Sequence, residues 1–527
     1  MAQDGQAHHE NRWWTLGAVC VATFMLLLDI TIVNVALPDI AKSLGSTFTD
    51  LQWVIDAYAL SLAALLLTSG SLADLFGRRL IFVCGLALFT CASLLCGLAG
   101  SPTFLDVARA IQGIGGAAMF ATSLALLAQA FHGRERGTAF GIWGATTGAA
   151  VAVGPLVGGL LTQTLGWQSI FFINLPIGIG AIIVTLQRVA ESRNPTGARV
   201  DWGGLFTFSI GLFLLVFALV RGNAEGWGST IILSSLVGAA MLLVAFVVIE
   251  SRLANPMFDL TLFRKRAFTG AAIVAFTLSA SMFSMFLYLT LYIQNSLGYS
   301  PLQAGLRFLP FSLMAFCVAP IAGRLSARMP VRLLMGGGLA LVGVGLLLMH
   351  GLDASSAWTS LLPGFLIAGG GVGLINPPLA STAISVVEPQ RSGMASGISN
   401  TFRQVGIATG TASLGALFQQ LLQTKVPDAF AKAPAPVHGL VSRLPVEAYA
   451  NGSPGPLARI PGGRAAYLGA FTSALNDLFL VGAAVAFVGA ICALVLITRR
   501  DLVAAPAAEG PPAEAVAEPS PERTPAA

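Results

Sequence analysis

Residues Arg109-Ala110-Ile111-Gln112-Gly113-Ile114-Gly115 begin a stretch that returns, in altered form, as Phe365-Leu366-Ile367-Ala368-Gly369-Gly370-Gly371. The offset is 256 positions both from 113 to 369 and from 154 to 410. Glycines in apolar stretches let helix backbones approach closely, and a parallel repeat of membrane helices is typical of transporters whose halves rock about a central site. The repeat therefore predicts a transporter. Five glycines keep the offset: Gly113, Gly115, Gly137, Gly141 and Gly154 pair with Gly369, Gly371, Gly393, Gly397 and Gly410.

The composition indicates a protein that crosses the membrane many times. The chain has 527 residues, of which 55% are hydrophobic and 10% charged, with a mean hydropathy of +0.78. Soluble globular domains carry about 25% charged residues. The 6 cysteines lie in apolar stretches without CxxC spacing, so we expect no metal site. No P-loop or catalytic triad is visible, and we expect no enzyme activity, no cofactor and no nucleic-acid partner.

The charge pattern of the loops predicts the orientation in the membrane. A spanning helix needs about 20 apolar residues, and we identify fourteen candidate stretches. Basic residues concentrate in alternate short loops, including Arg78–Arg79, Arg134–Arg136, Arg264–Arg266 and Arg499–Arg500. Because basic loops stay in the cytoplasm, both termini are expected there. The Ala- and Gly-rich composition, with few lysines, suggests a bacterium with a GC-rich genome, and we expect the protein in its cytoplasmic (inner) membrane.

The spans divide into six plus two plus six. We therefore predict an all-α polytopic membrane protein with fourteen transmembrane helices and two pseudo-symmetric six-helix bundles. The even number of inserted helices preserves the orientation of the second bundle. The predicted parts are a cytoplasmic tail 1–14, a bundle 15–190, a linker 191–266 with two extra helices, a bundle 267–500 that contains a long external loop 423–464, and a disordered cytoplasmic tail 501–527.

The loop after the second span reads Gly70-Ser71-Leu72-Ala73-Asp74-Leu75-Phe76-Gly77-Arg78-Arg79. It resembles the signature loop of the major facilitator superfamily, although Leu75 replaces the arginine common at that place. The resemblance implies the major facilitator fold and a latch between the two halves, made by Gly70, Asp74, Gly77 and Arg78. The related loop of the second half has Ala327 where an acid is expected. The alternative is that these arginines only set the orientation in the membrane.

Four further stretches resemble the fourteen-helix drug:proton antiporters of the EmrB/QacA type. They are Leu28–Pro38 (LDITIVNVALP), Trp53–Tyr58 (WVIDAY), Ile170–Pro176 (IFFINLP) and Leu297–Gly305 (LGYSPLQAG). The resemblance covers nearly the whole chain and is specific for the family, much less so for the substrate.

Three ionisable residues are candidates for proton coupling. Asp29 and Asp56 are carboxylates inside apolar spans. Insertion of a charged side chain into the middle of a membrane costs roughly 2.5–3.5 kcal/mol, so such residues usually have a function. Arg109 stands in a motif that resembles the superfamily motif linked to proton transfer. We favour Asp29 as the proton or cation site. The alternative is that Asp29 only pairs with Arg109 to hold helices together.

The fifth span carries the residues Gly141, Gly154, Pro155, Gly158 and Gly159, which resemble the antiporter motif of the family. Proline removes a backbone donor and bends a helix, while small residues permit close packing. The resemblance favours export over import. Helix packing alone is the alternative.

The predicted substrate contacts are Met285, Tyr288, Tyr292, Arg403 and Asn34. Methionine and aromatic side chains suit adaptable pockets, although core packing explains any one of them equally well. The spans between Thr261 and Val426 contain no carboxylate, whereas Arg403 stands in the middle of a span. A charge there requires water or a partner, and neutral, monocationic and anionic amphiphiles remain open as substrates.

We therefore predict a proton-coupled antiporter that exports amphipathic organic compounds, with the proton gradient as its energy source. A dedicated exporter of one metabolite, antibiotic or lipid is the first alternative. A non-transporting membrane sensor or scaffold is an alternative of another class. The expected partners are small amphipathic molecules, protons and lipid, with a periplasmic adaptor and outer-membrane channel if the host has two membranes.

Overall fold

The computed structural model describes residues 2–131, 133–193, 201–253, 258–326, 328–385, 392–431 and 449–497, and the isolated residues 256, 441, 444 and 446. The predicted tail 501–527 lies outside them. In this part of the chain every regular element is a helix. The first half contains α1 (Ala2–Leu44), α2 (Phe48–Phe76), α3 (Arg78–Gly97), α4 (Pro102–Ala130), α5 (Gly133–Leu165), α6 (Ser169–Phe172) and α7 (Asn174–Arg188).

Two helices, α8 (Trp202–Glu225) and α9 (Thr230–Arg252), join the halves. The second half contains α10 (Arg266–Leu278), α11 (Ser284–Leu291), α12 (Pro301–Ser326), α13 (Val331–Met349), α14 (Leu362–Ser385), α15 (Ser392–Ala429) and α17 (Gly463–Leu496). The π-helical turns η2 (Ser279–Phe283) and η3 (Tyr292–Ser296) continue α10 and α11 into one long span. The helix α15 runs to Ala429, into the range 423–464 that was expected to be a loop.

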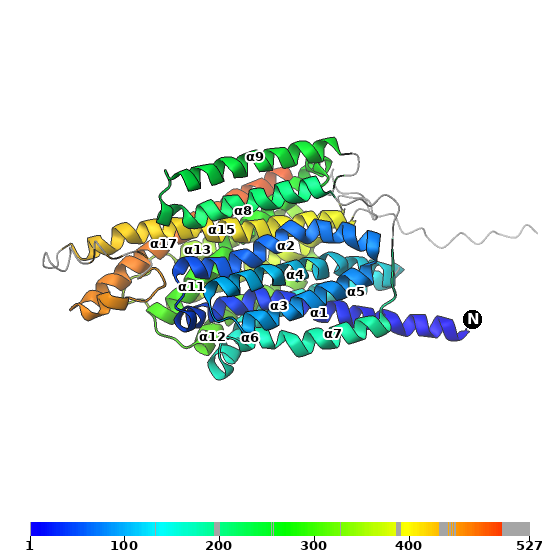
Figure 1. The fold of residues 1–527 in the computed structure, drawn as a ribbon, viewed down its shortest axis with the longest axis horizontal. Coiled ribbons are helices and arrows are strands. Elements are labelled where there is room, and N and C mark those ends of the chain that lie inside the picture. The colour runs from blue at the N-terminus through cyan, green and yellow to red at the C-terminus, as the bar shows by residue number, and fades with distance from the viewer. Residues whose placement is uncertain are drawn as a thin grey trace, which may run out of the picture.

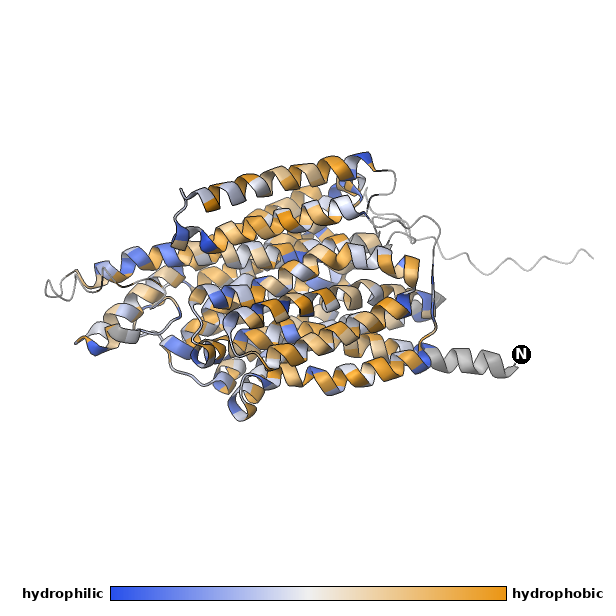
Figure 2. Cartoon of the chain, in the orientation of Figure 1, coloured by the Kyte–Doolittle hydropathy of each residue, from blue (hydrophilic) through white to orange (hydrophobic). Residues whose placement is uncertain are grey.

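The predicted number of spans is confirmed. Thirteen helices of the described residues are long and apolar enough to cross a membrane. A fourteenth is α5, when Ile142–Ala150 and Val153–Leu165 count as one span bent by 43°. Figure 1 shows the helices lying side by side along the long axis, and Figure 2 shows that apolar residues dominate their middle parts.

The helices start where local chemistry satisfies their free N–H groups. At α2 the Thr47 hydroxyl accepts from the Asp50 N–H, while the Asp50 carboxylate accepts from the Thr47 N–H over 2.7 Å. At α4 the Ser101 side chain caps the helix and Pro102 occupies its first position. Such caps stabilise a helix by about 1 kcal/mol, and they fix the turns that bring consecutive spans back through the membrane.

Glycines at the repeat offset pack against equivalent helices in the two halves. A Cβ atom on Gly113 of α4 would overlap the Tyr58 carbonyl oxygen of α2, and one on Gly369 of α14 would overlap the Phe311 carbonyl oxygen of α12. Two more pairs of glycines show the same correspondence. A Cβ atom would overlap α3 at Gly115 and α13 at Gly371, and it would overlap α1 at Gly154 and the span that begins with α10 at Gly410. The sequence repeat is therefore a repeat of helix-to-helix contacts.

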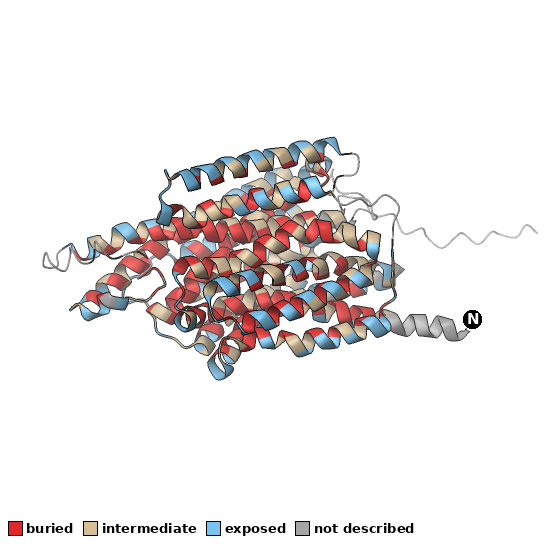
Figure 3. Cartoon of the chain, in the orientation of Figure 1, coloured by how far each residue is buried: buried red, intermediate tan, exposed pale blue. Residues whose placement is uncertain are grey.

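The pair α8–α9 lies outside the two bundles, beside α2 and α15 (Figure 1). The outer helix α9 is pale blue along much of its length in Figure 3, in contrast to the red interior. Its apolar residues Met241 and Val244 are 64% and 63% exposed. An exposed apolar surface of this length fits contact with lipid chains.

Hydrogen bonds between the halves gather near one end of the bundles, which we call the Ser300 end. There the Ser300 hydroxyl donates to Gln163 Oε1 over 2.8 Å, and Gln294 Nε2 donates to the Val35 carbonyl over 2.6 Å. The opposite end carries Asp74, and we call it the Asp74 end. Direct hydrogen bonds thus join the two halves at the Ser300 end.

Candidate functional site

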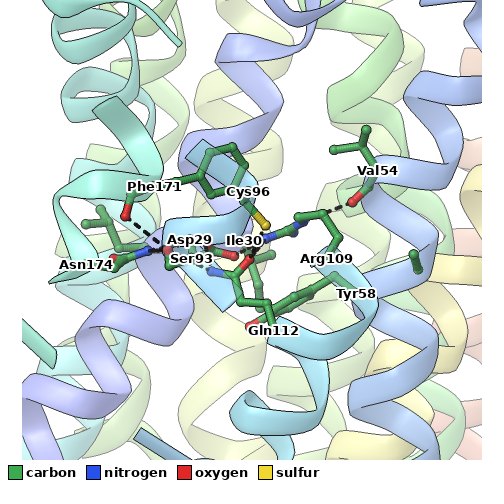
Figure 4. A network of polar contacts seen from close by, with 12 residues as sticks. Asp29, Ile30, Val54, Tyr58, Ser93, Cys96, Arg109, Gln112, Phe171 and Asn174 are labelled. Atoms are coloured by element: carbon green, nitrogen blue, oxygen red, sulfur yellow. Dashed lines mark hydrogen bonds and ion pairs between the residues drawn. The ribbon is translucent and has the colours of Figure 1, made fainter. Parts of the chain in front are cut away.

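Asp29 of α1 and Arg109 of α4 form an ion pair inside the first half (Figure 4). Both residues are buried, with exposed fractions of 1% and 2%. The Arg109 Nε group also donates to the Val54 carbonyl of α2 over 3.1 Å. The guanidinium lies 4.2 Å above the ring of Tyr58, a distance at which a cation is attracted to the ring face.

Polar side chains from two more helices complete this network (Figure 4). Gln112 accepts from Arg109 over 2.7 Å and donates to Asp29 Oδ1 over 2.9 Å. Ser93 of α3 accepts from Gln112 and from Asn174 of α7, over 3.2 and 2.9 Å. Because charges buried in this way need compensation, the network holds five helices of the first half (α1, α2, α3, α4 and α7) together in one arrangement.

Of the three residues predicted for proton coupling, the structure brings two together. Asp29 and Arg109 form the ion pair that both interpretations of Asp29 allow and that a purely structural role requires. That Asp29 also exchanges a proton stays a prediction. The partners Gln112, Ser93 and Asn174 were missed by the sequence analysis. Their only signal was position: Gln112 lies one turn after Arg109, and Asn174 lies in the quoted stretch before Pro176.

Asp56 is in a different environment from Asp29. Its side chain is fully buried in α2, and neither carboxylate oxygen has a hydrogen-bond partner among the described residues. One turn earlier, Gln52 donates to the Thr411 carbonyl of α15 over 3.2 Å, and the Tyr288 hydroxyl donates to the same carbonyl over 2.9 Å. Asp56 therefore lies where the first half meets α11 and α15 of the second half.

The predicted latch loop makes its contacts within the first half. The Arg78 guanidinium donates two hydrogen bonds to Asp74 Oδ1, over 3.0 and 2.9 Å. Glu191, after α7, accepts the Arg79 N–H over 2.9 Å. Gly77 has φ +124°, and a Cβ atom there would overlap the Glu191 carboxylate. The backbone conformation thus requires glycine at position 77, whereas Gly70 faces open space.

The antiporter-motif residues make contacts on two sides of α5. Side chains at Gly154 and Gly158 would overlap Thr31 and Ile32 of α1. On the other side, a Cβ atom at Gly159 would overlap α12 at Pro301. In the reverse direction, Gly305 of α12 lies against the Pro155 carbonyl. The motif packs α5 against α1 and against the second half; Gly141 lies outside the residues whose surroundings are described.

Of the five predicted substrate contacts, three are buried and two are half-buried. Met285, Tyr288 and Tyr292 have exposed fractions of 0%, 0% and 1%, so protein covers them in this conformation. Asn34 is half-buried and donates to the Ile30 carbonyl of its own helix over 2.9 Å. Arg403 is half-buried, with its guanidinium 5.2 Å above the ring of Phe283.

Two repeated helix bundles, joined by a peripheral helix pair and with ionisable residues buried in one of them, define a secondary transporter. Residues 19–411 match the Major Facilitator Superfamily, and the chain belongs to this family of transporters, which are not enzymes. It is a multi-pass membrane protein.

The relatives are resistance and export proteins. The chain is 39% identical over 425 residues to the multidrug resistance protein Stp of Mycobacterium tuberculosis, covering 80% of this chain and 79% of that protein. It is 33% identical over 495 residues to the tetracenomycin C resistance and export protein of Streptomyces glaucescens, covering 93% and 92%. The fold resembles a bacterial homologue of the human lysosomal transporter Spinster, solved in an inward-facing conformation. The TM-score is 0.59 at 17% identity, covering 94% of this chain and 99% of the other.

Proposed function

We propose that the protein exports amphipathic organic compounds across the bacterial inner membrane in exchange for protons. Membership of the superfamily and relatives named for drug resistance and antibiotic export support this function. The observation that carries the proton part is the Asp56 carboxyl group, which is fully buried and has no partner among the described residues. An isolated ionised carboxylate is too costly in such a place, so the group fits the neutral, proton-carrying form.

In this mechanism Asp56 carries the proton between the two sides of the membrane. Asp56 packs against the second half in the present conformation, so rocking of the halves opens and closes its access to water. The pair of Asp29 and Arg109 keeps the first half rigid, because Gln112 and Asn174 hold the Asp29 carboxylate as well. Asp29 remains the second candidate for the exchanged proton.

The orientation follows from the basic loops, which place the Asp74 end and both termini in the cytoplasm. The contacts at the Ser300 end then correspond to closure on the outer side, and the protein is poised to take substrate from the cytoplasm. A proton that enters down the membrane potential supplies about 2.3 kcal/mol per 100 mV. The proton gradient is the only energy source that the proposal needs.

The test is dye transport by the purified protein in liposomes under an imposed pH gradient. Wild type should move at least one of two dyes, anionic sulforhodamine B or cationic rhodamine 6G, against its gradient, and the Asp56→Asn variant should move that dye no faster than empty liposomes. Downhill exchange of dye for dye should persist in Asp56→Asn, because substrate binding does not require the proton site. Gradient-driven transport in Asp56→Asn, together with its loss in Asp29→Asn, would move the proton to Asp29.

A dedicated exporter of a single compound is the second candidate function. It is favoured by relatives whose names refer to one antibiotic, such as the tetracenomycin C protein and the puromycin resistance protein of Streptomyces alboniger, 36% identical over 441 residues. Failure to move dyes of every charge, by a protein that is folded and inserted, would favour this candidate.

A further inference from the structure

Arg403 lies in the membrane-spanning helix α15, and no carboxylate of the described residues pairs with it. In the part of the chain that the structure describes it makes no ion pair and no hydrogen bond, and its only charge contact is the Phe283 ring at 5.2 Å. The spans from α10 to α14 contain no acidic residue, and the Asp477 carboxylate of α17 is taken by Lys425 over 2.6 Å. Among the described residues of the second half, no carboxylate therefore pairs with Arg403.

The neighbours of α15 show which way Arg403 faces. Thr411 and Gly415 meet Gln52 of α2, while Asn223 of α8 donates to the Ala416 carbonyl. By the periodicity of 3.6 residues per turn, Arg403 lies on the side of α15 that is nearly opposite to α8. Since α8–α9 border the lipid, Arg403 faces the inside of the protein, between the directions of α10 and α2.

Phe283 is the first of a series of aromatic side chains in the second half. Its ring lies 6.1 Å from that of Phe286, which lies 5.3 Å from Phe308 and 5.2 Å from Phe311. Phe283 and Phe286 are half-buried, as is Arg403. A cation and flat apolar rings are thus presented together, a combination that suits a flat aromatic molecule with an acidic group.

We propose that Arg403 is a specificity-determining residue that binds the acidic oxygen of aromatic substrates, whose ring system packs against Phe283. The inference rests on the proposed export function and names the class of substrate. An acidic oxygen would compensate the Arg403 charge with charge-assisted hydrogen bonds. A cationic compound of the same shape would be repelled, because no carboxylate in the described part of the second half offsets the charge of Arg403.

Two dyes with a common xanthene ring system and opposite charge test this inference: sulforhodamine B is anionic and rhodamine 6G cationic. Their binding to the purified full-length protein in detergent is measured by fluorescence anisotropy. Wild type should bind sulforhodamine B more tightly. In Arg403→Gln the Kd for sulforhodamine B should rise about tenfold or more, as for loss of one hydrogen bond to a charged group. The Kd for rhodamine 6G should fall, since the repulsion is gone.

Two further variants separate charge from packing. Arg403→Lys keeps the charge and should retain most of the preference for sulforhodamine B. Phe283→Leu removes the ring and should weaken both dyes by a similar factor. If rhodamine 6G binds more tightly than sulforhodamine B in wild type, or if Arg403→Gln weakens both dyes equally, the inference is overturned.

Transport of the same dyes distinguishes this inference from the proposed function. If wild type shows the binding preference but moves neither dye under a pH gradient, export is overturned and the role of Arg403 in binding stands. If wild type exports dye and Arg403→Gln keeps the wild-type preference between the dyes, export stands and the role of Arg403 is overturned. The wild-type preference needs no variant, so the test does not depend on whether Arg403→Gln folds.

Discussion

At position 109 the first half carries a buried arginine, and 256 residues later the second half carries Phe365, which is also fully buried. Gln112, one turn further, corresponds to Ala368. Where Arg109 meets a carboxylate, Phe365 meets the ring of Phe308 at 5.6 Å. The glycines that follow at 113 and 369 nevertheless pack against equivalent helices.

The comparison of Arg109 with Phe365 separates the requirements of helix packing from those of the chemistry of the site. Close helix contacts depend on glycine and on backbone geometry, and they tolerate a complete exchange of the side chains around them. The chemistry has diverged: the first half buries ionisable groups, while the second half buries aromatic rings and, among its described residues, pairs no carboxylate with Arg403. If both proposals above hold, the first half carries the proton and the second half selects the substrate.

The largest effect is expected when the first half is given the residues of the second. Arg109→Phe leaves the buried Asp29 without its partner, which should lower the free energy of unfolding by about 3–5 kcal/mol. The double variant Asp29→Met with Arg109→Phe carries the residues found 256 positions later, Met285 and Phe365, and removes both charges. It should recover much of the loss, because no uncompensated charge stays buried.

Thermal and denaturant unfolding in detergent measures these differences. If the double variant is as unstable as Arg109→Phe alone, the ion pair is not the reason for the loss, and polar groups such as Ser93 and Asn174 must dominate. If both variants are as stable as wild type, the network has no structural role in the first half. Either result would break the comparison between Arg109 and Phe365.

A smaller and symmetric effect is expected at the repeated glycines. Gly113→Ala and Gly369→Ala each place a Cβ atom against a backbone carbonyl, and overpacking of this kind costs typically 1–3 kcal/mol. Gly180→Ala in α7 is the matched control, since nothing lies within 4 Å of its Cβ position. The two repeat variants should lose similar stability in the same unfolding assay and the control none; a loss in only one would show that the halves pack differently.

The general architecture could be predicted from the sequence because it depends on local patterns. Apolar stretches give the spans, and the glycines at the offset of 256 give the repeat. The pairing of Asp29 with Arg109 could also be foreseen, because two opposite charges in apolar spans of one bundle are expected to find each other. These features need no knowledge of how the helices are arranged.

The rest of the site could not be predicted because it depends on contacts between distant segments. Ser93 and Asn174 are 81 positions apart and come from different helices, and neither is unusual in its own span. The isolation of Asp56 depends on what surrounds α2, which the spacing of Trp53–Tyr58 does not show. Tyr288 was predicted to contact substrate from its helical face, but that face packs against α15.

The smallest effect on stability is expected in the loop after the second span of the first half, which contains Asp74. The related loop of the second half has Ala327 where an acid is expected. Asp74→Ala removes the pair with Arg78, whose side chains are 38% and 24% exposed. A pair of this exposure contributes about 0–1 kcal/mol, so the free energy of unfolding should change by less than 1 kcal/mol.

The rate of dye export in liposomes decides whether that pair acts as a latch. Arg221→Ala is the control, because it breaks the similarly exposed pair of Arg221 and Glu225 in α8, outside both halves. A latch at Asp74 requires export to slow in Asp74→Ala and not in Arg221→Ala, with both proteins equally stable. Equal export by the two variants would mean that Asp74 does not act as a latch and that its carboxylate serves only the local pair with Arg78.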